Sequence, residues 1–298
     1  MLPDVAPGLW DIVRGPALPV VAGVLGLVVG SFLNVVIARV PEGQSVVSPG
    51  SRCPRCGHTL AWYENVPLFS WLALRARCRG CRAPISVRYP LVELLVGLLF
   101  AACAVRFGPT WGLVRGMLLV GFLVPLSFID LEHWVLPFSL TIPGAVAGLL
   151  SAIPLGSEAL LDSAIGAAVG FLFFFSLETL LRLLLRKEAL GAGDKWLVLL
   201  VGAYLGWKPL FGLLLLSNVQ GAVVGGALLV ARGRAGPRAP AAGSAATEDG
   251  WEPGATHVPF GPFIALAALE LMLLGPWLAA TFPGPLVGLI TGEPWEIR

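Results

Sequence analysis

The stretch GAGDKWLVLLVGAYL, residues 191–205, joins a Gly-x-Gly-Asp turn to a run of apolar residues. Its Asp194 stands where the apolar run begins. A carboxylate at the mouth of a membrane helix is costly and rarely accidental. A second aspartate, Asp130, closes another apolar run at 111–129. The two carboxylates are therefore predicted to form one pair at one face of a membrane.

The composition does not fit a water-soluble protein. Of the 298 residues, 56% are hydrophobic and 13% are charged, against a charged share of about 25% in an average soluble domain. The mean hydropathy is +0.83. The sequence thus predicts an all-α integral membrane protein. The net charge of +2 decides little about partners.

The amino terminus does not resemble a cleaved signal peptide. The first 16 residues carry Asp4, Asp11 and a single basic residue, Arg14. A signal peptide starts with basic residues and ends in a small-residue cleavage site. We therefore expect the first apolar run to be retained as a helix.

About eight runs are candidates for membrane helices, which need about 17–25 residues each. They lie at about 17–38, 90–106, 111–129, 135–153, 160–182, 195–206, 209–231 and 259–280. The run at 195–206 is short for a span. It would need help from residues 206–210, or a partly polar start exposed to water.

Two segments are expected outside the membrane. Residues 39–89 contain Arg, Pro, Gly and four cysteines and are expected to form a small extramembrane insert. Residues 232–257 are rich in Ala, Gly and Pro and are expected to form a flexible loop. The predicted organisation is a first helical region at 1–38, the insert, and a membrane domain at 90–298.

The basic residues are divided unevenly between the two ends of these helices. If eight helices alternate in direction, fifteen of the 20 Lys and Arg residues fall on the side of the insert and five on the other. Basic loops stay in the cytoplasm. The insert is therefore predicted to be cytoplasmic and both termini to lie outside. Asp130 and Asp194 both fall at the cytoplasmic boundary.

The aspartate pair predicts acid–base catalysis. Two carboxyl groups held close together cannot both ionise cheaply, so they share a proton. One can act as a base on water while the other protonates a carbonyl oxygen, as peptide hydrolysis by an aspartic protease requires. Gly191 and Gly193 add backbone freedom and allow a substrate strand to approach. The alternative is that Asp194 only caps the start of its helix, and these residues alone leave both open.

The cysteines have the spacing of a metal site. Cys53-Pro-Arg-Cys56 and Cys78-Arg-Gly-Cys81 form a C-x2-C, 21 residues, C-x2-C pattern. Each pair sits on a tight turn that points two sulfurs at one point, and two such turns complete a tetrahedral Zn²⁺ site. The cytoplasm keeps thiols reduced, so structural zinc is favoured over disulfides. Redox-active or free thiols are the alternative.

Six segments, in the order in which they occur, resemble the type IV prepilin peptidases. These are prepilin leader peptidases and N-methyltransferases of the GxGD-type intramembrane aspartic protease family. The segments are Gly30-Ser-Phe-Leu-Asn-Val-Val-Ile-Ala-Arg-Val-Pro41, the cysteine insert with Trp62-Tyr-Glu-Asn-Val-Pro67, Arg88-Tyr-Pro-Leu-Val-Glu93, Phe128-Ile-Asp130 with Leu136-Pro137, Glu188-Ala-Leu-Gly-Ala-Gly-Asp194, and Phe260-Gly-Pro-Phe263. The resemblance covers nearly the whole chain.

The resemblance implies an enzyme of the bacterial inner membrane that cleaves the short basic leader of prepilin and pseudopilin precursors after a glycine. It also implies methylation of the new amino group, usually on phenylalanine, with S-adenosylmethionine as donor. Asp130 and Asp194 match the family's catalytic aspartates. The expected partners are these precursors and the lipid bilayer, and no nucleic acid.

Five polar residues near the predicted cytoplasmic boundary are candidates for binding the methyl donor or the amino group. They are Asn34, Glu64, Asn65, Arg88 and Glu93. None matches a Gly-rich nucleotide motif, so the methyl-transfer site is inferred from the resemblance.

The sequence departs from the family pattern at two places. The family usually has an acid after Leu-Pro, where this chain has Phe138, and this favours Asp130 as the first catalytic residue. The family's lysine usually stands two places after the second aspartate, whereas Lys195 stands one place after it. Its side chain therefore points about 100° around the helix from the direction of the family's lysine. Separately, Glu178 and Arg182, four residues apart on one helix, are expected to pair.

Two other functions stay open from the sequence. One is a peptidase that has lost methylation. The other is a transporter with a zinc-stabilised cytoplasmic cap, in which the aspartates line a proton or cation path. A transporter should have polar or broken helices near the middle of the bilayer. Here the acids concentrate at one face, with Glu270 the main exception.

Overall fold

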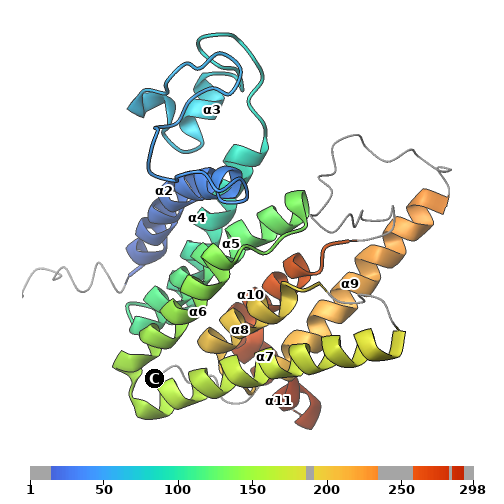
Figure 1. The fold of residues 1–298 in the computed structure, drawn as a ribbon. Helices are drawn as coiled ribbons and strands as arrows, with labels where there is room; N and C mark the ends of the chain where they lie inside the picture. The colour runs from blue at the N-terminus through green and yellow to red at the C-terminus, as the bar shows by residue number, and fades with distance from the viewer. Residues whose placement is uncertain (1–14, 186–190, 234–257, 282–283, 292–298) are drawn as a thin grey trace, which may run out of the picture. The chain divides into compact units, whose positions relative to one another are not determined.

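The computed structural model describes residues 15–185, 191–233, 258–281 and 284–291 (Figure 1). Helices dominate these ranges, and the β-bridges within them are two isolated ones in the insert. Seven of the described helices are long and apolar enough to cross a membrane. The chain is thus an all-α, multi-pass membrane protein, as its composition predicts.

The seven long helices occupy seven of the eight predicted runs. They are α2 (Ala17–Arg39), α4 (Arg88–Phe107), α5 (Trp111–His133), α6 (Phe138–Ala152, continued by η2, Ile153–Leu155), α7 (Ser157–Leu185), α9 (Leu210–Gly233) and α10 (Gly261–Thr281). The remaining run is α8 (Asp194–Leu205), whose 12 residues are too few to span a membrane alone. It ends at Gly206, where φ is +75°.

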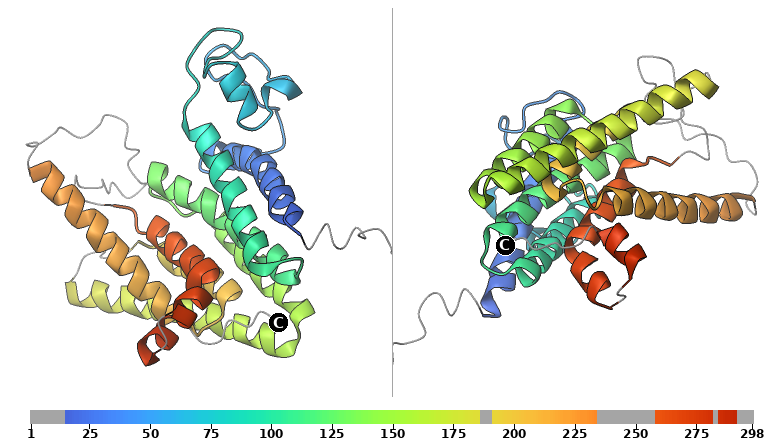
Figure 2. Two further views of the ribbon diagram at one scale, coloured as in Figure 1. Left: turned by 180° about the vertical axis from the view of Figure 1, so that it is seen from behind. Right: turned by 90° about the horizontal axis from the view of Figure 1, so that it is seen from below.

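The chain divides into two compact units, residues 1–125 and 126–298, with the boundary inside α5. In the first unit α2 and α4 lie side by side (Figures 1 and 2). Glycines on α2 allow this contact, because a Cβ on Gly26 would lie 2.7 Å from the Val96 carbonyl oxygen and a Cβ on Gly30 2.8 Å from Glu93 Cα. Small residues let membrane helices approach this closely.

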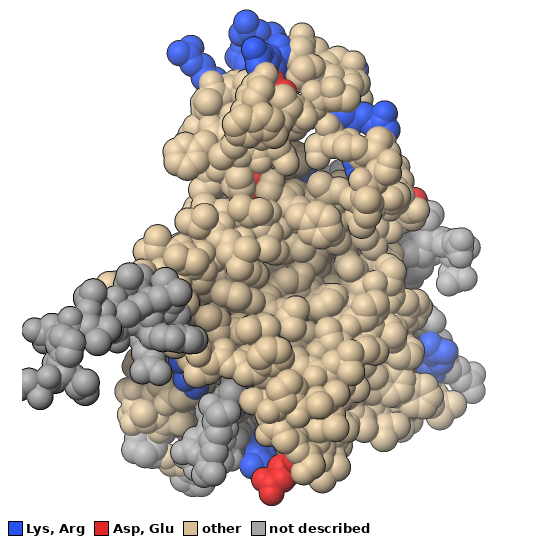
Figure 3. Space-filling model, turned by 90° about the vertical axis from the view of Figure 1, so that its left-hand side faces the viewer, with Lys and Arg blue, Asp and Glu red and all other residues tan. Residues whose placement is uncertain are grey.

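The insert connects α2 to α4 and contains two short helices, η1 (Trp62–Glu64) and α3 (Phe69–Ala73). It is tied to α4 by the backbone N–H of Leu68, which donates to Glu93 Oε2 at 2.8 Å. Basic side chains gather at the end of the insert in Figure 3. The insert therefore carries exposed basic side chains and is anchored to α4.

In the second unit, α8 is the most deeply buried helix. Every residue from Leu197 to Leu205 is buried except Leu199, and α8 packs against α6, α7 and α10. Gly202 of α8 meets Gly166 of α7 so closely that a Cβ on either would overlap the other's backbone. A short helix can stay in this position because protein surrounds it.

The helices α9 and α10 are joined by a polar contact. Gln220 Nε2 donates to Glu270 Oε2 at 2.5 Å. Hydrogen bonds of this kind connect helices in lipid, where water is absent. Glu270 therefore has a partner inside the bundle. A short helix, α11 (Pro285–Thr291), follows α10 and is not among the predicted elements.

Several predictions lie outside the described residues. The structure describes only residues 232 and 233 of the predicted loop at 232–257, and both belong to α9. The termini, residues 1–14 and 292–298, are also outside, as is the Glu188 end of the second aspartate motif.

Candidate active site and metal centre

Asp194 is the first residue of α8 and is held by the glycine turn before it. Its backbone N–H donates to the Gly191 carbonyl at 3.1 Å, and the Gly191 backbone hydrogen-bonds to the Asp194 carboxyl group. Gly193 has no room for a side chain, because a Cβ there would lie 2.8 Å from Leu136 Cβ. Asp194 is only 4% exposed, so its carboxyl group is buried.

Asp130 lies one turn before the end of α5 at His133, and not at the helix end as the apolar run predicts. The next residue, Trp134, has φ of +59° and lies outside the helix. Asp130 Oδ2 accepts a hydrogen bond of 3.0 Å from the backbone N–H of Gly261 at the start of α10. The sequence points to the segment that contains Gly261 through its Phe-Gly-Pro-Phe motif, but not to this contact.

The structure brings the two carboxyl groups into one site. Leu136 packs against both Gly193 and Gly261, the glycines beside Asp194 and Asp130. Both carboxyl groups are buried, and in a medium of low dielectric two such groups do not ionise together. A pair of this kind holds one proton between them and can accept and donate protons in the same reaction.

Lys195, next to Asp194, is turned toward α7. Its Nζ lies 2.6 Å from Glu178 Oε2, and the Arg182 guanidinium lies 3.0 Å from Glu178 Oε1. The predicted pairing of Glu178 with Arg182 is confirmed, whereas the contact with Lys195 was not predicted. This contact ties the first turn of α8 to α7.

The two positions where the sequence departs from the family pattern contact each other: Phe138 stands in place of the acid, and Trp196 in place of the lysine. Phe138, after Leu-Pro, packs edge-on against Trp196, with ring centroids 5.3 Å apart. Trp196 stands two places after Asp194. Its ring also packs against Phe171 of α7, with the ring centroids 4.8 Å apart. An aromatic cluster therefore fixes the starts of α6 and α8 against each other beside the carboxyl pair.

In the insert, the two cysteine pairs form matching turns. In each turn the residue after the second cysteine, Gly57 or Arg82, has positive φ and donates its N–H to the carbonyl of the first cysteine at 2.9 Å. The N–H of the first cysteine donates to the carbonyl of the following residue, which is His58 in one turn (2.9 Å) and Ala83 in the other (2.8 Å). The two turns therefore present their sulfurs in the same way.

The four sulfurs have the arrangement of a metal site. The Sγ atoms of Cys53, Cys56, Cys78 and Cys81 all lie within 4.8 Å of one another. The Cys53–Cys81 pair is 3.8 Å apart and the Cys56–Cys78 pair 3.9 Å. A tetrahedron with Zn–S bonds of about 2.3 Å has edges of about 3.8 Å. These four residues could therefore hold a metal ion.

Four thiols this close do not ionise independently. Hydrogen bonds from the backbone of Cys56 and Arg55 lower the pKa of Cys53 to about 6. The pKa of Cys56 is raised to about 11: the His58 backbone lowers it, but desolvation and the neighbouring Cys81 sulfur outweigh that donor. A divalent cation removes this conflict, because it stabilises all the thiolates together.

Glu64, a predicted cofactor residue, is engaged within the insert. Its Oε2 lies 3.0 Å from His58 Nε2 and accepts the Ala61 N–H at 2.9 Å, and its Oε1 lies 3.7 Å from Arg79. The Ala61 N–H, followed by His58, lowers the pKa of Glu64. His58 follows the first cysteine turn and Arg79 lies within the second, so Glu64 joins the two turns.

Three other predicted cofactor residues also have structural contacts. Asn34 Nδ2 donates to the Tyr89 carbonyl at 3.1 Å and joins α2 to α4. Glu93 accepts the N–H of Leu68 in the insert. The Arg88 guanidinium lies over the Tyr89 ring, 5.4 Å from its centroid.

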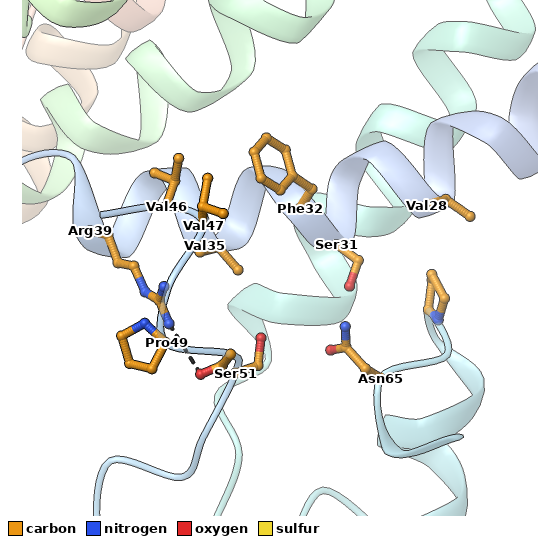
Figure 4. Close-up of a pocket in the computed structure, with 12 residues that line it drawn as sticks. Val28, Ser31, Phe32, Val35, Arg39, Val46, Val47, Pro49, Ser51 and Asn65 are labelled. Atoms are coloured by element: carbon orange, nitrogen blue, oxygen red, sulfur yellow. Dashed lines mark hydrogen bonds between the residues drawn. The ribbon is translucent and has the colours of Figure 1, made fainter. Parts of the chain in front are cut away.

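A pocket of about 340 Å³ lies between α2 and the insert (Figure 4). Asn65 and Ser31 point toward each other across it, and Arg39 lies at its other end (Figure 4). Of the five predicted cofactor residues, Asn65 is the one that lines this pocket. The full lining is Val28, Ser31, Phe32, Val35, Arg39, Val46, Val47, Pro49, Gly50, Ser51, Asn65 and Pro67.

Comparison with known proteins gives two matches to family models. Residues 24–107 match the bacterial peptidase A24 N-terminal domain, and residues 117–226 match the type IV leader peptidase family. The second of these is a family of aspartic-type proteases. No solved structure matches.

Several curated proteins are similar over most of the chain, and each carries the name prepilin leader peptidase/N-methyltransferase. One from Myxococcus xanthus is 52% identical, over 94% of this chain and 97% of its own. One from Aeromonas hydrophila is 40% identical, over 84% and 88%, and one from Pseudomonas aeruginosa is 37% identical, over 87% and 91%. The chain therefore belongs to the type IV leader peptidase family.

Proposed function

We propose that this protein removes the basic leader of prepilin and pseudopilin precursors and then methylates the new amino terminus. Cleavage follows a glycine and takes place at the cytoplasmic face of the bacterial inner membrane. The observation that carries this proposal is the buried carboxyl pair of Asp130 and Asp194 in a member of this family. The names of the similar proteins support both activities.

In the cleavage step, the ionised carboxylate of the pair takes a proton from a water molecule as that water attacks the scissile carbonyl. The protonated carboxyl group donates its proton to the carbonyl oxygen. The carboxyl group that took the proton from water then donates it to the leaving nitrogen, the other carboxylate takes back a proton from a hydroxyl of the tetrahedral species, and the C–N bond breaks. The pair ends with one proton again, as it began.

The location of the pair suits a membrane-bound substrate. A precursor with a basic leader and an apolar helix lies with its cleavage point at the cytoplasmic boundary. The unequal division of Lys and Arg residues supports the assignment of the insert to the cytoplasm. Asp130 near the end of α5 and Asp194 at the start of α8 then belong to that same boundary.

The insert is proposed to bind Zn²⁺ through Cys53, Cys56, Cys78 and Cys81. Four thiolate ligands complete the coordination of zinc and leave no open position, so the ion is structural. Few large apolar side chains are buried in the insert, and a small segment of this kind depends on metal for its folding.

S-adenosylmethionine is the proposed methyl donor, and the pocket between α2 and the insert is its candidate site. The volume of about 340 Å³ falls in the range of small-molecule sites. Valine and phenylalanine side chains supply apolar walls, and Asn65, Ser31 and Arg39 supply polar groups. The donor provides an electrophilic methyl group, and the chain's own residues orient the acceptor amine. Equilibrium binding of S-adenosylhomocysteine to Asn65→Ala is the direct check, with tenfold weaker binding expected.

The two activities can be read in one experiment. A pilin precursor is incubated with the purified full-length protein, with and without S-adenosylmethionine, and the products are analysed by mass spectrometry. We expect loss of the leader in both reactions and a gain of one methyl group only with the donor. An intact precursor would refute the peptidase activity. A cleaved but unmethylated product would support the peptidase activity and refute the methyltransferase activity.

A further inference from the structure

We propose that Gly261, at the start of α10, is a positioning residue for Asp130. Its backbone N–H holds Asp130 Oδ2, so that proton exchange during cleavage falls to Oδ1. This inference rests on the proposed aspartate chemistry and adds a third element to it, because it makes the amino end of α10 part of the active site.

The amino end of α10 presents a single backbone donor at this place. The first N–H groups of a helix have no partner within the helix. Pro262 has no N–H, and the N–H of Phe263 donates to the Phe260 carbonyl at 3.0 Å. The N–H of Gly261 donates to Asp130 Oδ2 at 3.0 Å. The helix thus directs one donor at one carboxylate oxygen, where its dipole also favours negative charge.

The absence of a side chain at Gly261 is a requirement of this contact. A Cβ there would lie 2.5 Å from Asp130 Oδ2 and 3.2 Å from its Cγ. It would also lie 3.5 Å from Leu136 Cδ2. Asp130 is itself only 6% exposed, so its carboxyl group has no solvent to move into. Any larger residue must displace Asp130 from its position relative to Asp194.

The contact spans 131 positions of sequence and links α5 to α10. It fixes the rotation of a carboxyl group that would otherwise turn about its terminal bond. A fixed orientation lowers the cost of reaching the reactive geometry, and a displacement of about 1 Å reduces the rate about 10²-fold.

The first test compares two alanine substitutions on the same helix. Gly261→Ala is expected to lower kcat for leader cleavage about 10²-fold with KM nearly unchanged, and to leave methylation of a pre-cleaved pilin intact. Gly275→Ala is the matched control, because nothing lies within 4 Å of a Cβ added there, and it should cleave like the wild type. Cleavage by Gly261→Ala within threefold of wild type would overturn the proposal, as would an equal loss in the control.

A second measurement does not depend on the folding of Gly261→Ala. Hydrogen exchange of a peptide covering 258–263 reports the amides of Phe260, Gly261 and Phe263, because the two prolines have none. We expect one amide of this peptide to exchange faster in Asp130→Ala and none to do so in Asp194→Ala. Equal exchange in all three proteins would contradict the proposal. Failure of the wild type to cleave any precursor would instead refute the proposed function, so the two failures are distinguishable.

Discussion

The cysteine cluster and the carboxyl pair are built in opposite ways. The cluster draws four ligands from 29 consecutive residues, and each pair is placed by hydrogen bonds within its own turn. The carboxyl pair joins residues 64 positions apart, and its geometry depends on α5, α8, α10 and Leu136 of the α5–α6 connection together. The first site is local and suits a cation, whereas the second is assembled by tertiary packing and suits a proton.

This difference indicates which changes each site tolerates. The cluster should fail when a ligand is lost and should not respond to helix packing elsewhere. The carboxyl pair should fail when the helices around it shift, even though no carboxylate is altered. The predictions below use this contrast, beginning with the largest expected effect.

Loss of two cysteines should abolish zinc binding and methyl transfer but leave leader cleavage intact. Cys53→Ser combined with Cys78→Ser removes one ligand from each turn, so we expect bound zinc to fall from about one ion per chain to none. Methyl transfer should be lost with it, while leader cleavage continues, because the carboxyl pair lies in the second unit. Elemental analysis and product mass spectrometry measure these effects.

Cys103→Ser is the control for this experiment, because Cys103 is buried in α4 away from the cluster residues. It should keep its zinc. Full zinc retention by the double variant would refute the metal site, and loss of cleavage together with zinc would show that the sites are not independent.

Tighter packing at the α7–α8 contact should impair only the carboxyl pair. A Cβ at Gly202 would overlap the Gly166 backbone, so Gly202→Ala forces α8 to move. We expect a loss of about 1–3 kcal/mol in the free energy of unfolding and a more than tenfold loss of cleavage, with zinc retained.

Thermal unfolding and cleavage rates check this prediction. Gly226→Ala on α9 is the comparison, because a Cβ there meets nothing within 4 Å. If Gly202→Ala cleaved at the wild-type rate, the dependence of Asp194 on helix packing would be refuted.

The contrast also explains what sequence could predict. The cluster follows from spacing alone, since Cys-x-x-Cys turns are local structures. Seven long helices follow from apolar runs, and the Glu178–Arg182 pair follows from helical periodicity. The short length of the sixth run, at 195–206, is visible in the sequence, but sequence does not show that surrounding helices would bury α8.

Contacts between distant segments were beyond sequence reasoning. The N–H of Gly261 on Asp130 and the approach of Lys195 to Glu178 depend on how helices are placed. The candidate cofactor residues illustrate the same limit. Polar character near the boundary singled out Asn34, Glu64 and Glu93, but in the structure they hold helices and turns together.

The smallest expected effect concerns Lys195. Lys195→Met removes the ion pair with Glu178, which Arg182 still contacts. We expect a loss of about 1 kcal/mol in the free energy of unfolding and a few-fold slower cleavage. Glu178→Gln alone already removes the ion pair with Lys195, so the loss in the double variant should be smaller than the sum of the two single losses. Strict additivity in unfolding measurements would show that the pair has no coupling.

The most direct test of the central claim is the rate of leader cleavage by Asp130→Asn, by Asp194→Asn and by the double variant. Residues that act as one unit give losses that do not add, so each single change should lower kcat about 10²–10⁴-fold and the double variant should be no slower. Glu132→Gln, an exposed acid beside Asp130, should cleave normally. Near-normal cleavage by either single variant, or losses that multiply in the double variant, would contradict a shared catalytic pair.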